Sequence, residues 1–92
     1  MATLDAAELE EFTRTNGAWA VAGTALEREW KLADFAAAVT FVERVAALAE
    51  RANHHPDILL HGYNRVRLTL STHSEGGITA RDVALAREID AL

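Results

Sequence analysis

Three of the four histidines in this chain of 92 residues fall in two short segments. His54 and His55 are neighbours just before Pro56, and His73 follows a strand-like run that ends at Thr72. Imidazole is the side chain that can give or take a proton near pH 7 without a large pKa perturbation. Histidines beside strand ends therefore indicate acid–base chemistry, provided that the fold brings the two segments together.

Each of these histidines, taken alone, also suits a simpler role. His54 and His55 suit a helix C-terminus, whose dipole favours imidazole, and His73 suits a solvent-facing strand end. A zinc site is disfavoured because the chain has no cysteine and no His-x-x-x-His pair, and adjacent histidines converge poorly on one ion. A hydrolytic triad of Ser71, His73 and Asp82 is disfavoured because Ser71 has no Gly-x-Ser-x-Gly context.

Composition excludes several classes of partner. The formal net charge is −5 and the basic residues are dispersed, so we expect no direct nucleic-acid partner. No apolar run approaches the roughly 20 residues that span a bilayer, and the first residues do not resemble a signal peptide. The chain has no cysteine for a disulfide framework. We expect a cytoplasmic protein without a membrane partner, in which residues 1–92 form a single domain small enough to favour a homodimer or homotetramer.

The first elements to be expected are a helix and a hairpin. A helix is predicted over 4–13, with Thr3 as N-cap, and Asn16-Gly17 ends it. Alternating apolar and polar residues from 19 to 32 predict strand structure, with a hairpin at Gly23.

A long helix follows. Asp34 is a good N-cap for a helix over about 35–51, and Pro56 disfavours helical geometry close to Asn53. Apolar residues at helical spacing mark its buried stripe: Phe35, Ala38, Val39, Val42, Val45, Ala46 and Ala49.

Two strands and a helix complete the chain. Strands are predicted over 58–62 and 65–72, and the second alternates strictly between apolar and polar residues. Its parity places His73 away from the apolar face. Thr79-x-x-Asp82 predicts the start of a helix that runs to about Asp90. The predicted fold is α+β: a four-stranded antiparallel sheet with three helices packed on one face, in the order α-β-β-α-β-β-α.

The spacing of these residues resembles the pterin-4a-carbinolamine dehydratases, also called 4a-hydroxytetrahydrobiopterin dehydratases. The resemblance extends from about residue 9 to residue 89. Its motif positions are Glu50, His54-His55-Pro56, Tyr63, His73 and Asp82.

The resemblance implies a dehydratase. Its substrate would be the 4a-hydroxytetrahydropterin left by a pterin-dependent aromatic amino acid hydroxylase, and its products quinonoid dihydropterin and water. One group must donate a proton and another accept one, while no metal and no bound cofactor are required.

The same resemblance assigns residues to roles. His54, His55 and His73 would be catalytic, with the proton transfers given to His54 and His73. Glu50 and Asp82 would support the imidazoles. Substrate contacts would come from two segments: His54, His55 and Pro56, and Thr72, His73, Ser74 and Glu75. Some members carry Asp in place of Asn53 and Trp in place of Ile58, which bears on substrate preference.

An alternative is a non-catalytic dimerisation or coactivator-type interaction module, because relatives of this family are implicated as partners of transcription regulators. A role in molybdopterin metabolism is a further alternative. An interaction module has no need to keep Glu50, Asp82 and the three histidines together, so the sequence favours the enzyme.

Overall fold

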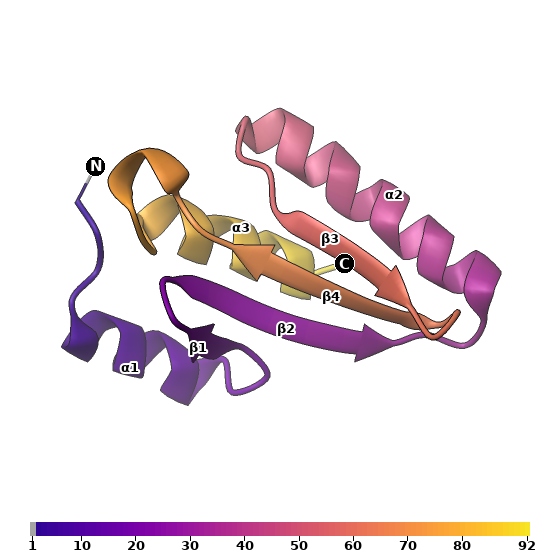
Figure 1. Ribbon diagram of the computed structural model, residues 1–92, viewed down its shortest axis with the longest axis horizontal. Coiled ribbons are helices and arrows are strands. Elements are labelled where there is room, and N and C mark those ends of the chain that lie inside the picture. The colour runs from indigo at the N-terminus through magenta and orange to yellow at the C-terminus, as the bar shows by residue number, and fades with distance from the viewer. Residues whose placement is uncertain (1) are drawn as a thin grey trace.

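The computed structural model describes residues 2–92 and confirms the predicted order of elements (Figure 1). The elements are α1 (Ala6–Thr15), β1 (Ala20–Ala22), β2 (Ala25–Lys31), α2 (Phe35–Ala52), β3 (Asp57–His61), β4 (Arg65–Leu70), the short 3-10 helix η1 (His73–Glu75) and α3 (Ala80–Asp90). The four strands form one antiparallel sheet in the order β1-β2-β4-β3.

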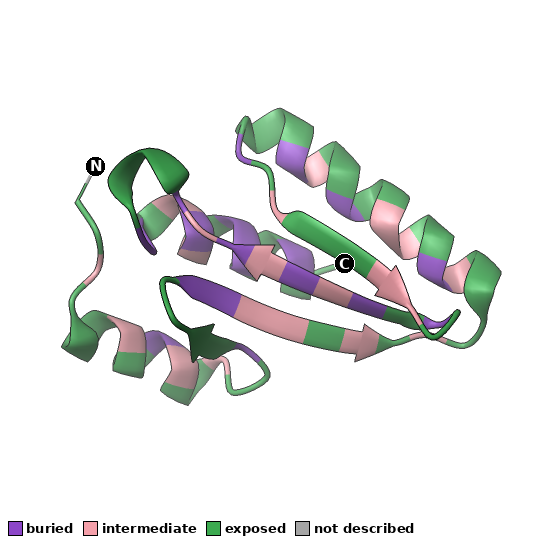
Figure 2. Cartoon of the chain, viewed as in Figure 1, coloured by how far each residue is buried: buried purple, intermediate pink, exposed green. Residues whose placement is uncertain are grey.

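Strand β4 carries the centre of the core. Val66, Leu68 and Leu70 are fully buried, and they alternate with half-buried or exposed residues along the strand (Figure 2). Val66 lies opposite Trp30 on β2 and Leu60 on β3, so this face of the sheet is apolar apart from Arg28 on β2. The three helices pack on that face, as the period-2 pattern predicts.

Helix α2 begins as predicted and ends one residue later than predicted. The carboxylate of Asp34 accepts a hydrogen bond from the Ala37 amide at 2.8 Å. At the other end Asn53 adopts a left-handed conformation, with φ of 49°, and terminates the helix. No helix among residues 2–92 is both long and apolar enough to cross a membrane.

The apolar stripe expected on α2 is only partly covered. Ala38, Val45 and Ala49 are buried, whereas Phe35 is 56% exposed and Val39 is 36% exposed. Val42, from the same stripe, is half-buried and packs against the core, as do Phe41 and Leu48 beside it. The predicted stripe is therefore covered in its middle and towards the end of the helix, but not at Phe35 and Val39 in its first turns.

Helix α1 has Asp5 as its N-cap rather than the predicted Thr3, so it covers Ala6–Thr15 rather than the predicted 4–13. The Asp5 side chain accepts from the Glu8 amide at 2.8 Å, while the Glu8 carboxylate accepts from the Asp5 amide at 3.0 Å. This reciprocal capping box satisfies two free amides, which a cap at Thr3 would not do.

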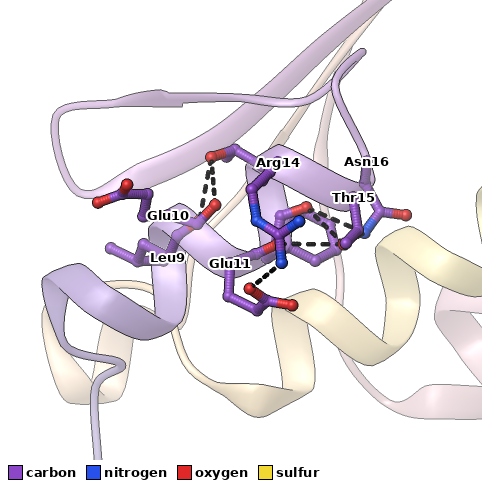
Figure 3. A network of polar contacts seen from close by, with 8 residues as sticks. Leu9, Glu10, Glu11, Arg14, Thr15 and Asn16 are labelled. Atoms are coloured by element: carbon purple, nitrogen blue, oxygen red, sulfur yellow. Dashed lines mark hydrogen bonds and ion pairs between the residues drawn. The ribbon is translucent and has the colours of Figure 1, made fainter.

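The end of α1 carries a local network of polar contacts (Figure 3). Thr15 and Asn16 bond to main-chain carbonyls one turn back, and Arg14 pairs with Glu11. Each of these contacts spans four residues or fewer, so the network closes the helix without joining it to another element.

A second polar contact joins the hairpin to α3. The indole of Trp19, only 2% exposed, donates to Asp90 at 2.9 Å, and Arg28 reaches the same carboxylate at 2.6 Å. The Arg28 guanidinium also lies 4.4 Å above the Trp30 ring. Arg28 is thereby accommodated on the otherwise apolar face of β2.

Candidate active site

The loop after α2 is fixed by its own main chain. The His54 amide donates to the Ala49 carbonyl at 3.1 Å, which completes the helix end. The Asn53 carbonyl accepts from Nη2 of Arg81 on α3 at 2.7 Å. The position of His54 is therefore set by a helix terminus on one side and by a second helix on the other.

His54 makes a buried contact with Asp82. Its Nε2 lies 2.5 Å from Oδ1 of Asp82; the histidine is 8% exposed and the aspartate 0%. These two residues are 28 positions apart in the chain. A short hydrogen bond to a carboxylate in a buried setting holds the imidazole in one orientation.

Asp82 is also the helix cap expected from Thr79-x-x-Asp82. Its Oδ2 accepts from the Thr79 amide at 2.9 Å, and the same oxygen accepts from the Thr72 hydroxyl at 2.8 Å. Oδ1 is left for His54. Aspartate, in place of the glutamate usual in a capping box, thus closes the box with one oxygen and holds the histidine with the other.

Thr72 begins the turn that carries His73. Strand β4 ends at Leu70, earlier than the predicted residue 72, because Thr72 bridges to Gly77 and the chain between them forms η1. The Thr72 carbonyl accepts from the Glu75 amide at 2.9 Å. Gly76 has φ of +71°, which favours glycine there. The tight turn exposes His73 next to buried Thr72.

His55 lies on the surface with Glu50. Its Nε2 is 2.7 Å from Oε2 of Glu50, and the two side chains are 59% and 77% exposed. Glu50, in the last turn of α2, therefore contacts His55 and not the buried His54. A pair this exposed orients an imidazole but contributes little to stability.

The remaining residues expected at the site lie near these groups in the chain. Pro56 is half-buried ahead of β3, whereas Ser74 and Glu75 are exposed on η1. The Thr72 hydroxyl is occupied, because it contacts both Asp82 and Thr79. Within residues 2–92 no hydrogen bond joins the rings of His54, His55 and His73, so the contribution of each to substrate binding stays a prediction.

Three hollows show where a molecule could approach, and two of them border α3. A cavity of about 170 Å³ lies between the end of α2 and α3 and is lined by His54, Arg81 and Glu88 among others. A larger apolar hollow, about 410 Å³, lies between α1 and α3, and none of the three histidines lines it. The smaller cavity is therefore the one of these two that borders a candidate histidine, His54.

Sequence reasoning missed two residues that shape this region. Thr79 was expected only to cap a helix, yet its hydroxyl lies 2.8 Å from that of Thr72. Arg81 was not singled out, although it anchors the loop before His54. The capping-box pattern was the available signal for Thr79, whereas nothing in the spacing indicated Arg81. No three His, Asp or Glu side chains of the described chain are arranged to hold a metal ion.

The sequence matches the family model described as pterin 4 alpha carbinolamine dehydratase over residues 2–92. Two bacterial proteins provisionally named pterin-4-alpha-carbinolamine dehydratase are similar along almost their whole length. The one from Thermomicrobium roseum is 49% identical, over 97% of this chain and 95% of its own. The one from Chloroflexus aurantiacus is 48% identical, over 98% of this chain and 96% of its own.

Two solved structures share the fold. A transcriptional coactivator/pterin dehydratase from Brucella melitensis superimposes with a TM-score of 0.89 at 40% identity, and the match covers 97% of this chain and 96% of that one. A pterin dehydratase-like protein identified as a RuBisCO assembly factor in the alpha-carboxysome superimposes with a TM-score of 0.64. At 24% identity, over 79% of this chain and 83% of the other, the second likeness concerns the fold alone.

Proposed function

Because the chain belongs to the pterin 4 alpha carbinolamine dehydratase family, we propose that it removes water from 4a-hydroxytetrahydropterins. The substrate would come from a pterin-dependent aromatic amino acid hydroxylase, and the product would be the quinonoid dihydropterin. The enzyme would thereby recycle the pterin cofactor of that hydroxylase.

The dehydration requires two proton transfers, one from N5 and one to the leaving oxygen. The N5–H bond breaks, its electron pair forms the C4a=N5 double bond, and the C4a hydroxyl leaves with a proton as water. One group accepts the N5 proton and another protonates the leaving oxygen, and each positioned acid or base contributes roughly 100- to 10,000-fold. His54 and His73 are our candidates for these transfers, with His55 orienting the substrate.

The observation that carries this proposal is the buried contact between His54 and Asp82. A histidine held by a fully buried carboxylate, beside a cavity, is an arrangement suited to proton transfer. A purely structural role would be met by an apolar residue at the same place, without the desolvation of two polar groups.

The test is the dehydration rate of enzymatically generated 4a-hydroxytetrahydropterin, followed by ultraviolet absorbance. We expect the wild type to exceed the spontaneous rate, and His54→Ala and His73→Ala to lose most of that acceleration while circular dichroism shows them folded. His61→Ala is the matched control, because His61 contacts Glu29 on the sheet and should keep full activity. A folded wild type that does not exceed the spontaneous rate would overturn the proposal for this substrate.

We also propose that the protein self-associates through β3, the strand at one edge of the sheet. Leu59 at its centre is 49% exposed. Antiparallel pairing of two β3 strands about Leu59 sets Asp57 of each copy opposite His61 of the other, which matches opposite charges when His61 is protonated.

Light scattering after gel filtration tests this pairing. We expect the wild type to elute as a dimer or larger assembly and Leu59→Lys to dissociate, because two lysines would then face each other across the strand pair. Val21→Lys, at an exposed apolar position on β1 at the other edge of the sheet, should leave the mass unchanged. A monomeric wild type would refute the pairing.

A further inference from the structure

The structure assigns a reacting atom that the family name does not specify. We propose that a buried chain of hydrogen bonds through Thr79, Thr72 and Asp82 fixes the ring of His54 so that its Nδ1 exchanges a proton with the substrate. Thr72 and Thr79 are then positioning residues. The role in turnover rests on the proposed dehydratase function, whereas the ring assignment is independent of it.

The donor and the acceptor of each hydrogen bond in this series can be assigned. An ionised Asp82 only accepts hydrogen bonds, so the Thr72 hydroxyl must donate to its Oδ2 over 2.8 Å. With its hydrogen used, the Thr72 oxygen accepts from the Thr79 hydroxyl, also at 2.8 Å. The Thr79 oxygen in turn accepts from the Arg81 amide at 3.2 Å. No alternative set of donors satisfies all of these contacts.

Two donors therefore fix the Asp82 carboxylate independently of its contact with His54. Its Oδ2 has two donors, the Thr79 amide and the Thr72 hydroxyl, which leaves Oδ1 aimed at His54. Thr72 is 3% exposed, and Thr79 and Asp82 are 0% exposed. Because water does not reach these atoms, no solvent molecule can replace a missing donor.

The ring of His54 then has one usable nitrogen. Nε2 must carry a hydrogen to donate to Asp82, so in the neutral imidazole Nδ1 has the free lone pair. None of residues 2–92 hydrogen-bonds to Nδ1. His54 lines the small cavity with Arg81 and Glu88, the charged groups that share it. In either direction of transfer, the proton that moves is the one at Nδ1.

Thr72 also links the two halves of the site. Its hydroxyl supports Asp82 and thereby His54, while its carbonyl accepts from the Glu75 amide and shapes the turn that carries His73. One residue thus sets the orientation of one imidazole and the placement of another. Removing its hydroxyl should disturb His54 without displacing the main chain of the turn.

Nitrogen-15 NMR of the histidine rings tests the assigned atom in the wild type. We expect the neutral ring of His54 to carry its proton on Nε2 and none on Nδ1. A neutral ring that carries its proton on Nδ1 would overturn the assignment. This measurement needs no substrate, so it stands even if the dehydratase reaction fails.

Three threonine variants test the positioning role. Thr72→Val keeps the shape and removes the donor, and we expect kcat to fall about tenfold or more with KM changed less than about twofold, together with mixed protonation of the His54 nitrogens. Thr72→Ser restores the hydroxyl and should recover both readouts. Thr69→Val, on β4 but without a side-chain hydrogen bond among the described residues, should change neither.

The outcomes separate the two proposals. A Thr72→Val protein with wild-type kcat and an unchanged His54 proton position would overturn the positioning role. A wild type without dehydratase activity, but with His54 protonated at Nε2, would overturn the proposed function and leave the ring assignment standing. If Thr72→Val does not fold, Thr79→Val removes the next donor in the chain and is read in the same way.

Discussion

Two polar networks in this protein have similar chemistry and opposite surroundings. The one at the end of α1 is largely exposed, and each of its contacts spans four residues or fewer (Figure 3). The one around Asp82 is buried, and it joins residues up to 28 positions apart on three segments.

The difference shows how burial decides what a carboxylate does. In the exposed network, water replaces any partner that is removed, so the contacts shape a helix end and contribute little more. In the buried network, each donor left without Asp82 would remain unsatisfied. His54 is held by the buried network around Asp82, whose hydrogen bonds are costly to break.

Asp82→Ala should show the largest effect. It leaves His54, Thr72 and the Thr79 amide without their buried acceptor, and we expect the free energy of unfolding to fall by about 3–5 kcal/mol. Urea unfolding followed by circular dichroism measures this loss. A loss below about 1 kcal/mol would show that the buried network is no more important than the exposed one.

Asp90→Ala should have an intermediate effect. The Asp90 side chain is 23% exposed, and its removal leaves the indole N–H of Trp19 buried without an acceptor. We expect a loss of about 1–3 kcal/mol in the same urea experiment. A loss equal to that of Asp82→Ala would mean that the burial of a carboxylate does not determine how much it contributes to stability.

Glu29 provides a comparison that depends on pH. A hydrogen bond from His61 lowers the pKa of Glu29 below its ordinary value of 4.5, with smaller contributions from the charge of His61, from Arg67 and from Arg65 against the opposing effect of desolvation. A lowered folded-state pKa stabilises the protein above the unfolded value and ceases to do so as pH falls through the folded value.

The stability of the wild type relative to Glu29→Gln should therefore decline as the pH falls through and below 4.5. Thermal unfolding of both proteins across this range measures the difference. A difference that grew on acidification would have the wrong sign.

Glu11→Ala should have the smallest effect. Glu11 pairs with Arg14 on the surface of α1, and both side chains are more than 60% exposed. We expect the free energy of unfolding to change by no more than about 0.5 kcal/mol. A loss above about 1 kcal/mol would show that local exposed contacts do more than shape the helix end.

Much of the fold was predictable from local rules. The alternation along β4 identified a half-buried strand, because side chains point to opposite faces at successive positions. Asp34 identified the start of α2 by its capping chemistry. The start of α1 was misplaced because Thr3 and Asp5 both suit an N-cap, and the deciding signal was Glu8, three residues after Asp5.

The contacts within the candidate site could not be predicted from the sequence. The family resemblance assigned His54, His55, Glu50 and Asp82 to the site, yet it does not say which imidazole contacts which carboxylate. That depends on where α2 ends and on how α3 packs, which are tertiary features. The hydrogen bond from the Thr72 hydroxyl to Asp82 could not be predicted for the same reason.

The most direct test of catalysis through a buried His54–Asp82 pair compares the dehydration rates of Asp82→Asn and Asp90→Asn, each corrected for its folded fraction. Both substitutions remove a carboxylate that accepts from a buried ring N–H, but only Asp82 holds His54. We expect Asp82→Asn to lose most of the rate acceleration and Asp90→Asn to keep the wild-type rate. Equal rates for the two folded variants would contradict a catalytic role for the pair.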